Sequence, residues 1–374
     1  MKATILAGLA ALGLVAAVPG TGRAADPVKV GAVEALSGPA AKYGTAIRDG
    51  FVLAAAAINA KGGVLGGRPL QLVFEDSAGN KEQALNAVRK LIARDHVAAL
   101  LGPTLSDEMF AIGPVASQRG VPIIGTSNTA KGVTAIGPFV FRTSLPESDV
   151  LPVTLKAAAA KFHLKRVAVL YGNDDAFTQS GYEVFRDTLA KMGIAVAATE
   201  TFSKADTDFS AQLTKVKGLG VDALVVSALA EAGGGLVLQA RQLGLAMPIV
   251  GGNGFNSPKI AEIAGPAADG VISGSPWFVG KDDPRSKAFV TAFRAAYGHD
   301  PDQFAAQAYD TLNILAAAFD RAGDTQGAKL RDALLQTDAT GLLGPFRFTA
   351  GRDPASVEGV VVTMIKAGRF VPLN

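Results

Sequence analysis

The chain has 374 residues, of which 49% are hydrophobic and 18% are charged, and it contains no cysteine. This composition is typical of a well-buried globular protein, and the length favours two domains. A formal net charge of +3 leaves no basic stripe for nucleic acid, and the lack of cysteine excludes disulfides, thiol nucleophiles and zinc–thiolate sites.

The first residues have the pattern of a secretory leader. Lys2 supplies a positive head, residues 3–18 form a short apolar core, and the small residues Gly22 and Ala24 precede the expected cleavage point. The apolar core is shorter than the roughly 20 residues that a membrane-spanning helix needs. We therefore expect residues 1–24 to be a cleaved signal peptide and the mature protein to be exported.

The rest of the chain alternates apolar strands with amphipathic helices. Four strands separated by helices are expected before residue 146, and the same pattern begins again at Pro146. This order predicts parallel sheets with right-handed crossovers, and so two doubly wound α/β lobes. The expected strands lie within residues 28–33, 70–74, 96–106, 121–129, 166–171, 194–199, 223–227 and 248–251, and long helices are expected at 45–59, 81–94, 286–297 and 303–322.

Small hydroxyl residues follow the two strands expected within residues 96–106 and 121–129. Ligands of open α/β sheets bind beyond the carboxyl ends of strands, so Ser106, Ser127 and Thr129 are expected at one crevice. Hydroxyls and backbone amides without a strong base suit holding a small anionic or zwitterionic group. The alternative is structural: Ser106 caps a helix, and Ser127 and Thr129 only form a turn.

The sequence contains no recognisable catalytic or cofactor-binding motif. Its three histidines, His96, His163 and His299, lie in separate segments, which argues against a histidine-based triad or metal cluster. The glycine-rich stretch 62–67 follows a helix and precedes a strand, the reverse of the order in a dinucleotide-binding fingerprint. We expect no enzymatic activity, no cofactor and no metal. An exported hydrolase is the enzymatic alternative.

Five stretches carry a resemblance to a known family. Over nearly the whole mature chain, the sequence resembles the periplasmic leucine/isoleucine/valine-binding protein family of ABC importers. The resemblance implies the type I periplasmic binding protein fold, in which two doubly wound parallel-sheet lobes are joined by a hinge of three crossovers. The stretches are 36–44 (LSGPAAKYG), 59–67 (NAKGGVLGG), 70–76 (LQLVFED), 264–270 (AGPAADG) and 344–348 (GPFRF).

The resemblance also implies where the lobes begin and end. The three crossovers are expected near Leu145–Pro146, Ser275–Pro276 and Leu343–Gly344. The expected organisation is a signal peptide at 1–24, a first lobe of 25–145 plus 277–343, and a second lobe of 146–276 plus 344–374.

By the resemblance, Ser106, Ser127 and Thr129 lie where the family holds the carboxylate and part of the ammonium group of an amino acid. Leu105 precedes Ser106 and is expected to line the same site. Tyr43 matches the aromatic residue of the family's first ligand loop, which covers the ligand.

Two further aromatic residues are implied by position. Phe177 falls at the aromatic position of the second lobe, where a tyrosine is common in the family. Trp277, the single tryptophan, lies at an expected crossover and either stacks on the ligand or seals the hinge. Ordinary packing between the lobes is the alternative interpretation for Tyr43 and Phe177.

One departure from the family bears on the ligand. The amino-acid binders place a carboxylate after the strand equivalent to 248–251, where it pairs with the ligand ammonium, but this chain has Asn253 there. A buried ammonium without its counter-ion loses a bond worth roughly 1.5–3 kcal/mol. Glu231, in a neighbouring loop, is a candidate replacement.

The resemblance implies a solute-binding component of an ABC importer, located in the periplasm, that closes on a small carboxylate and docks on an inner-membrane permease. A branched-chain or other aliphatic amino acid is the expected ligand, and an amine-free aromatic or organic acid is the alternative. We expect a monomer that does not bind nucleic acid. A ligand-sensing receptor component is the rival function with the same fold.

Overall fold

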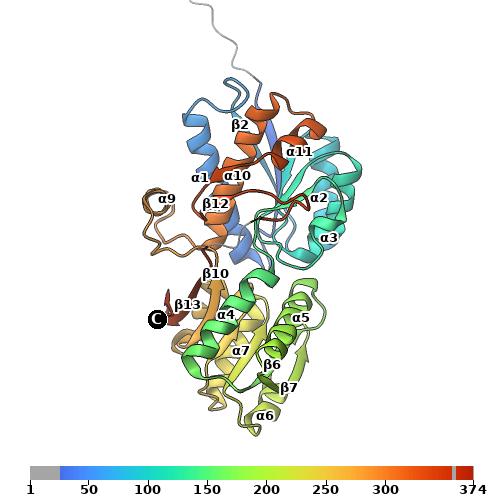
Figure 1. The fold of residues 1–374 in the computed structure, drawn as a ribbon. Coiled ribbons are helices and arrows are strands. Elements are labelled where there is room, and N and C mark those ends of the chain that lie inside the picture. Colours follow the sequence, from blue (N-terminus) through green and yellow to red (C-terminus); the bar gives the residue numbers. More distant parts are fainter. Residues whose placement is uncertain (1–25, 356–358, 374) are drawn as a thin grey trace, which may run out of the picture.

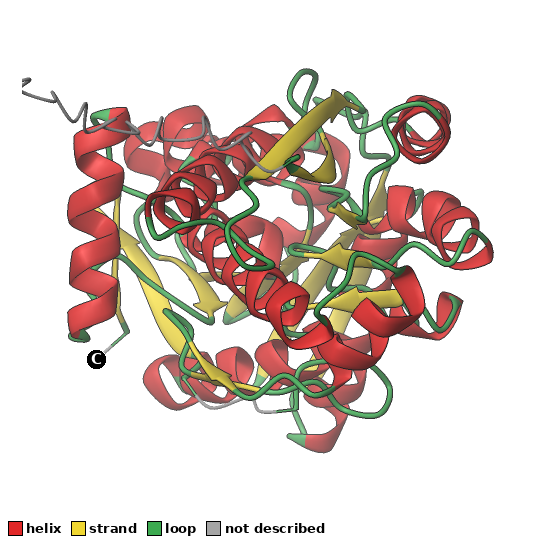
Figure 2. Ribbon diagram, turned by 90° about the horizontal axis from the view of Figure 1, so that it is seen from above, coloured by secondary structure: helices red, strands yellow, loops and turns green. Residues whose placement is uncertain are grey.

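The computed structural model describes residues 26–355 and 359–373, which form two lobes (Figure 1). The expected signal peptide, residues 1–24, lies outside the described residues. Each lobe has a central, mainly parallel sheet with helices on both faces, and a view from above shows the strands enclosed by helices (Figure 2). The predicted two-lobe α/β fold is therefore confirmed.

The first lobe contains a parallel sheet in the order β2-β1-β3-β4-β5. Helices α1 and α10 cover one face and α2 and α3 the other, so the inner strands are almost wholly apolar. The strands are β1 (Val28–Glu34), β2 (Leu70–Asp76), β3 (Ala99–Leu101), β4 (Ile123–Gly125) and β5 (Val140–Arg142), with the small ladder β11 (Ala339–Thr340) and β12 (Pro345–Phe346). The helices are α1 (Ala41–Ala60), α2 (Lys81–Ala93), α3 (Ser106–Gln118), α9 (Pro284–Tyr297), α10 (Gln303–Ala322), α11 (Gly327–Leu335) and the 3₁₀ turn η1 (Thr134–Ile136).

The second lobe repeats this topology. Its parallel strands follow the order β7-β6-β8-β9-β10, which matches the order of the first lobe strand for strand, and an antiparallel hairpin, β13-β14, is added at the edge. The strands are β6 (Arg166–Gly172), β7 (Ala195–Phe202), β8 (Ala223–Ser227), β9 (Ile249–Gly251), β10 (Val271–Ser275), β13 (Val361–Lys366) and β14 (Arg369–Pro372). The helices are α4 (Glu147–Phe162), α5 (Ala176–Lys191), α6 (Ser210–Lys217), α7 (Ala230–Gln242) and α8 (Lys259–Ala264), with the 3₁₀ turns η2 (Asn253–Asn256) and η3 (Gly265–Ala268).

The first helix begins earlier than its sequence predicts. Expected to start at Thr45, α1 begins at Ala41, so Tyr43 lies in its first turn and not in a loop. The residue before the helix is Ala40, whose side chain cannot make a capping hydrogen bond. The sequence therefore lacks the Ser, Thr, Asp or Asn that usually indicates where a helix begins. Gly44 permits the close approach of α1 to the end of β1, because a Cβ there would lie 2.1 Å from the carbonyl oxygen of Ala35.

The third crossover differs from the expectation. Residues 344–354, expected in the second lobe, pack on the first: Phe348 meets Phe141 edge-on at 5.1 Å, and Arg352 Nε donates to Val140 O at 3.1 Å. These contacts cover β5, which is the edge strand of the first sheet, and edge strands need such a cover. The chain reaches the second lobe only at β13, after Ala355.

The two lobes are in contact across their interface, so the structure is in a closed arrangement. Lys42 on α1 pairs with Glu262 on α8 at 2.6 Å. The backbone amide of Ala176, at the start of α5, donates to Asp107 Oδ1 on α3 at 2.9 Å. The backbone amide of Lys131 donates to Ser180 Oγ at 2.9 Å. Each of these bonds joins one lobe to the other.

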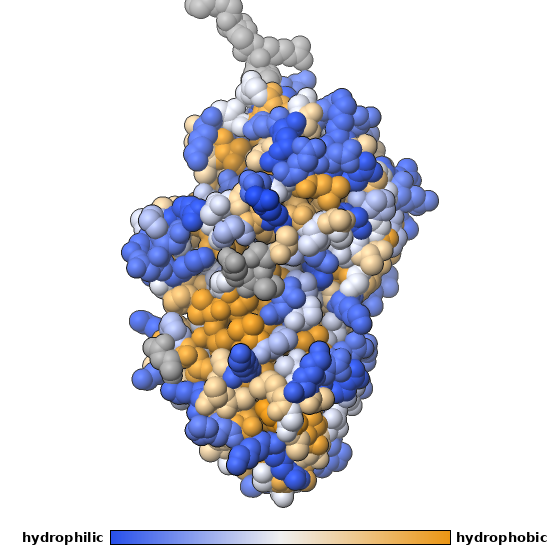
Figure 3. Space-filling model, viewed as in Figure 1, coloured by the Kyte–Doolittle hydropathy of each residue, from blue (hydrophilic) through white to orange (hydrophobic). Residues whose placement is uncertain are grey.

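Hydrophilic side chains cover most of the surface in Figure 3, whereas hydrophobic side chains gather on the second lobe close to its junction with the first. Val153 on α4 of the second lobe is one of the large hydrophobic residues exposed to solvent, with 41% of its surface accessible. None of the helices in residues 26–355 and 359–373 has the length and apolar character needed to cross a membrane.

Candidate functional site

A small cavity, with about 310 Å³ of empty space that is partly open to solvent, lies between the lobes. Its first-lobe walls follow β3 and β4, and its second-lobe walls follow β6, β8 and β9, so both sheets contribute the carboxyl ends of their strands. This is where open α/β sheets bind ligands. The lining residues are Tyr43, Thr104, Leu105, Ser106, Ser127, Phe177, Leu229, Asn253, Gly254 and Phe304.

The first lobe presents a helix N-terminus to the cavity. Ser106 is the first residue of α3 and is 2% exposed, and its Oγ has a long contact, 3.4 Å, from the backbone amide of Ala130. Its hydroxyl proton remains available to a ligand. The first amides of α3 lack acceptors inside the helix, and the helix dipole favours an anion at this end. Such a helix start is chemically suited to hold a small anion.

The neighbouring hydroxyls are held in place by other groups. Ser127 Oγ donates to the carbonyl oxygen of Thr104 at 2.7 Å, so its hydroxyl is left as an acceptor. Thr104 Oγ1 donates to Glu34 Oε2 at 2.5 Å and accepts from the backbone amide of Ala35 at 2.9 Å. Thr104 therefore shapes the wall without a free hydrogen-bonding group.

Two buried carboxyls lie behind this wall. Burial raises the pKa of Glu34 well above its usual value, against the opposing effect of the Thr104 hydrogen bond. Burial likewise raises the pKa of Glu108 to about 7, and Glu108 Oε2 accepts from the backbone amide of Leu105 at 2.9 Å. Desolvation favours their neutral forms. Because a neutral carboxyl carries no charge, these two side chains repel a carboxylate ligand less than two fully ionised glutamates at the same positions would.

The second lobe and α1 supply an apolar cover. Phe177 and Leu229 line the cavity, and Tyr43 packs edge-on against Phe304 with ring centroids 4.9 Å apart. The Tyr43 hydroxyl donates to the carbonyl oxygen of Gly254 at 2.8 Å and accepts from the backbone amide of Ala230 at 2.7 Å. Tyr43 thus closes the cavity and fastens the lobes together.

The side-chain amide of Asn253 is oriented by a buried network. Its Oδ1 accepts from Gln303 Nε2 at 2.6 Å and from Asn256 Nδ2 at 3.3 Å. Gln303 is fixed by Ser275, whose hydroxyl donates to its Oε1 at 2.7 Å, and Asn256 Nδ2 also donates to the carbonyl oxygen of Gly274 at 2.7 Å. Because Oδ1 is occupied, Asn253 offers a ligand its Nδ2, which is a donor.

Six of the eight predicted site residues line the cavity, and two do not. Thr129 faces away, because its Oγ1 donates to Glu147 Oε1 at 3.0 Å. Trp277 is 1% exposed and lies in the aromatic cluster of α9, with Nε1 donating to Ser286 Oγ at 2.7 Å. Trp277 therefore does not line the cavity, and it packs in the segment that follows β10. The six residues in the cavity are Tyr43, Leu105, Ser106, Ser127, Phe177 and Asn253.

Glu231 does not replace the missing family carboxylate. Its side chain is 51% exposed and pairs with Lys259 at 3.5 Å, outside the cavity lining. The sequence interpretation also missed four lining residues, Thr104, Leu229, Gly254 and Phe304. Thr104 lies two residues before Ser106 and was within reach of the strand-end argument, whereas Phe304 belongs to a distant helix and carried no signal.

No group of three or more histidine, aspartate or glutamate side chains within the described part of the chain is arranged to hold a metal ion. The cavity lining, with its hydroxyls, amides and aromatic rings, can bind a small organic ligand by hydrogen bonds and apolar contact.

Two α/β lobes of matching topology that close over a small cavity at their strand ends define a two-lobed ligand-binding protein. A family model described as "Periplasmic binding protein" matches residues 27–369, and the chain belongs to this family. It is a substrate-binding protein of the ABC transporter family and not an enzyme. The predicted membership of the leucine/isoleucine/valine-binding group is confirmed.

Curated relatives are similar over most of their length. The chain is 31% identical over 312 residues to the leucine-, isoleucine-, valine-, threonine- and alanine-binding protein of Pseudomonas aeruginosa, covering 83% of each chain. It is 27% identical over 322 residues to the Leu/Ile/Val-binding protein of Escherichia coli K12, covering 86% of each.

Solved structures of the same fold hold different ligands. A branched-chain amino acid binding protein of Streptococcus pneumoniae in complex with isoleucine is 30% identical, with a TM-score of 0.86 and coverage of 92% of this chain and 98% of that one. A solute-binding protein of R. palustris in complex with benzoate is 25% identical, with a TM-score of 0.84 and coverage of 93% and 95%.

Proposed function

We propose that this protein is the periplasmic binding component of an ABC importer and that it captures a small carboxylate without an ammonium group, such as an aromatic acid. Asn253 favours a ligand without an ammonium group, because its Oδ1 already accepts two hydrogen bonds and only a donor is left for the ligand. None of the described lining residues is charged. An ammonium here would lack both an acceptor on Asn253 and a counter-ion, a loss of roughly 1.5–3 kcal/mol.

The carboxylate of the ligand would sit at the N-terminus of α3, with the hydroxyl of Ser106 as a donor. The rest of the ligand would lie between Phe177, Phe304 and Leu229, which suits a ring. The benzoate complex of the R. palustris relative supports this ligand class.

The import cycle would begin in the periplasm, after removal of residues 1–24. The first lobe would bind the carboxylate, and closure would then bring Phe177 and Asn253 over the ligand and exclude water, which strengthens the hydrogen bonds inside. The closed monomer would dock on an inner-membrane permease, and a separate ATPase would supply the energy for transport.

An aliphatic amino acid is the second candidate. Ser127 favours it, because this hydroxyl donates to Thr104 O and can accept a hydrogen bond from a ligand N–H. The relatives from P. aeruginosa and S. pneumoniae, which bind such amino acids, support it as well. A ligand-sensing receptor component would use the same cavity and would differ only in its partner.

A thermal-shift panel on the mature protein tests the proposal. Benzoate and coumarate are compared with leucine and isoleucine, because a ligand that binds only the folded state raises the melting temperature. We expect the two aromatic acids to raise it and the two amino acids to leave it unchanged. Stabilisation by the amino acids alone would replace the proposal with the second candidate, and no response to any of the four would refute both ligand classes.

A further inference from the structure

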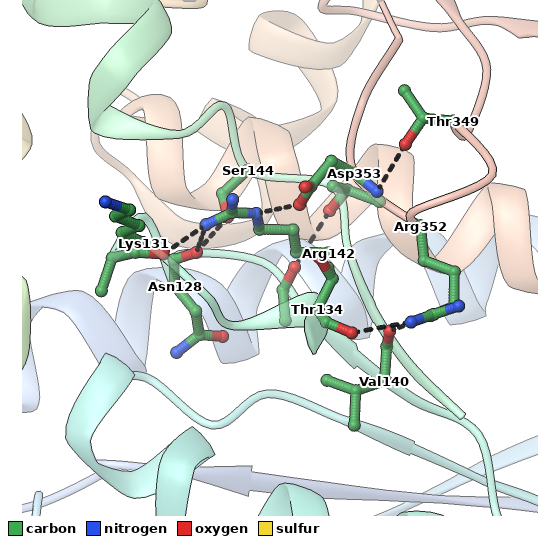
Figure 4. Close-up of polar contacts among 12 residues, drawn as sticks. Asn128, Lys131, Thr134, Val140, Arg142, Ser144, Thr349, Arg352 and Asp353 are labelled. Atoms are coloured by element: carbon green, nitrogen blue, oxygen red, sulfur yellow. Dashed lines mark hydrogen bonds and ion pairs between the residues drawn. The ribbon is translucent and has the colours of Figure 1, made fainter. Parts of the chain in front are cut away.

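A buried guanidinium lies directly behind the loop that carries Ser127. Arg142, the last residue of β5, is 3% exposed. Its Nη1 donates to the carbonyl oxygens of Asn128 at 3.1 Å and Ala130 at 2.8 Å (Figure 4). These carbonyls belong to residues 126–130, which follow β4 and which we call the ligand loop. One cation therefore fixes the backbone of this loop at two points.

The same guanidinium reaches the segment by which the chain crosses into the second lobe. Arg142 Nε donates to Asp353 Oδ1 at 2.5 Å. Asp353 lies in residues 347–355, which we call the crossover segment, and its backbone amide donates to Thr349 Oγ1 at 3.2 Å (Figure 4). This segment leads into β13 of the second lobe. Arg142 therefore connects the ligand loop to part of the hinge.

Arginine is the residue that this geometry requires. Its planar fork of donors serves two carbonyls and a carboxylate at once, whereas lysine has a single ammonium on a flexible stem. Buried carbonyls need a partner, and Asn128 O has a second donor in Ser144 Oγ at 3.1 Å. Ala130 O depends on Arg142 for the side-chain donor that faces it.

We propose that Arg142 is a positioning residue for ligand binding: it holds the ligand loop in the geometry that presents Ser127 to the cavity and couples that loop to the crossover segment. The inference rests on the proposed function in one respect, namely that the cavity is the ligand site. Arg142 itself does not line the cavity.

A second arginine provides a matched control. Arg352 lies in the same crossover segment and donates from Nε to Val140 O at 3.1 Å and from Nη2 to Thr134 O at 2.8 Å (Figure 4). These bonds fasten the segment to the first lobe without reaching the ligand loop. Arg352→Gln should therefore loosen the crossover segment and spare the ligand loop.

Amide hydrogen exchange of the ligand-free mature protein tests the inference without any ligand. We compare peptides that cover residues 125–131 in the wild type, Arg142→Gln, Asp353→Asn and Arg352→Gln. We expect Arg142→Gln to speed exchange in the ligand loop by at least about tenfold, Asp353→Asn to speed it less, and Arg352→Gln to act only near residues 134–140. Unchanged protection of the loop in Arg142→Gln, or an equal change in Arg352→Gln, would overturn the inference. Arg142→Lys serves the same comparison where Arg142→Gln does not fold.

Benzoate titration then separates positioning from stability. We expect Arg142→Gln to weaken benzoate binding about tenfold and Arg352→Gln to bind like the wild type, at a temperature where both are folded. Equal benzoate affinity in the wild type and Arg142→Gln would contradict the positioning role. A wild type that does not bind benzoate would instead count against the proposed function, and the exchange measurement would still decide the role of Arg142.

Discussion

The two lobes share one strand order but contribute different chemistry to the cavity. The loops after β3 and β4 of the first lobe provide Ser106 and Ser127, whereas the loops after β6, β8 and β9 of the second lobe provide Phe177, Leu229 and Asn253. Topology therefore fixes where ligand residues lie, at the strand ends of both sheets. The side chains at those places decide which lobe holds the polar end of the ligand and which covers the rest.

The corresponding helices α3 and α7 show the physical basis of this difference. Both follow the third strand of their sheet, and both point an N-terminus toward the interface. The N-terminus of α3 carries Ser106 and is open to the cavity. The first amide of α7, that of Ala230, is already occupied by the Tyr43 hydroxyl. In the second lobe, the N-terminal amide of α7 therefore holds the two lobes together. In the first lobe, the N-terminus of α3 remains open to the cavity.

The largest expected effect comes from giving the second lobe a charge. Asn253→Asp should weaken benzoate binding by about a hundredfold, because like charges facing each other in a buried site cost several kcal/mol. The same variant should gain affinity for isoleucine, whose ammonium would find a counter-ion. Calorimetric titration of both ligands checks this. Unaltered benzoate affinity in Asn253→Asp would mean that Asn253 does not face the ligand.

Removing the donor of the first lobe should have the next largest effect. Ser106→Ala should weaken benzoate binding about tenfold, the lower end of the value of a hydrogen bond to a charged group. Titration of Ser148→Ala, which deletes an exposed hydroxyl outside the cavity, is the matched control and should match the wild type. Equal affinities of Ser106→Ala and Ser148→Ala would place the carboxylate elsewhere.

The last expected effect is on stability and not on ligand affinity, and it concerns pH and the carboxyl that links the lobes. Burial raises the pKa of Glu147 from its usual 4.5 to about 7, with the Thr129 hydrogen bond and Arg142 opposing the shift. Between these two values the folded state holds a proton that the unfolded state has released, so the free energy of unfolding falls as pH rises from 4.5 to 7. Denaturant unfolding measured across this range gives the free energy of unfolding at each pH. This free energy should fall less steeply with pH in Glu147→Gln than in the wild type, and the difference should correspond to at most one bound proton.

The control for this prediction is Glu231→Gln, whose carboxyl is half exposed on the surface of the second lobe. It should leave the slope as in the wild type. An identical slope in Glu147→Gln and the wild type would show that Glu147 titrates alike in the folded and unfolded states.

Local signals in the sequence were sufficient for the fold and for part of the site. The alternation of strands and helices predicted eight of the ten strands β1–β10, all but β5 and β10, and the hydroxyls after β3 and β4 predicted Ser106 and Ser127 in the cavity. Such signals depend on burial periodicity and on the rule that ligands bind beyond strand ends. Both act within a few residues of the chain, so they can be read without knowing what packs against them.

The tertiary structure decided the direction of individual side chains and the path of the third crossover. Thr129 turns to Glu147, and Trp277 joins the aromatic cluster of α9. Asn253 keeps only a donor free, because Gln303, 50 residues away, occupies its oxygen. The crossover segment stays on the first lobe because β5 is an edge that needs covering. The sequence by itself determined two lobes with polar strand ends. Contacts between residues far apart in the chain decided which groups line the cavity, because hydrogen-bond partners and edge strands exist only once the sheets have formed.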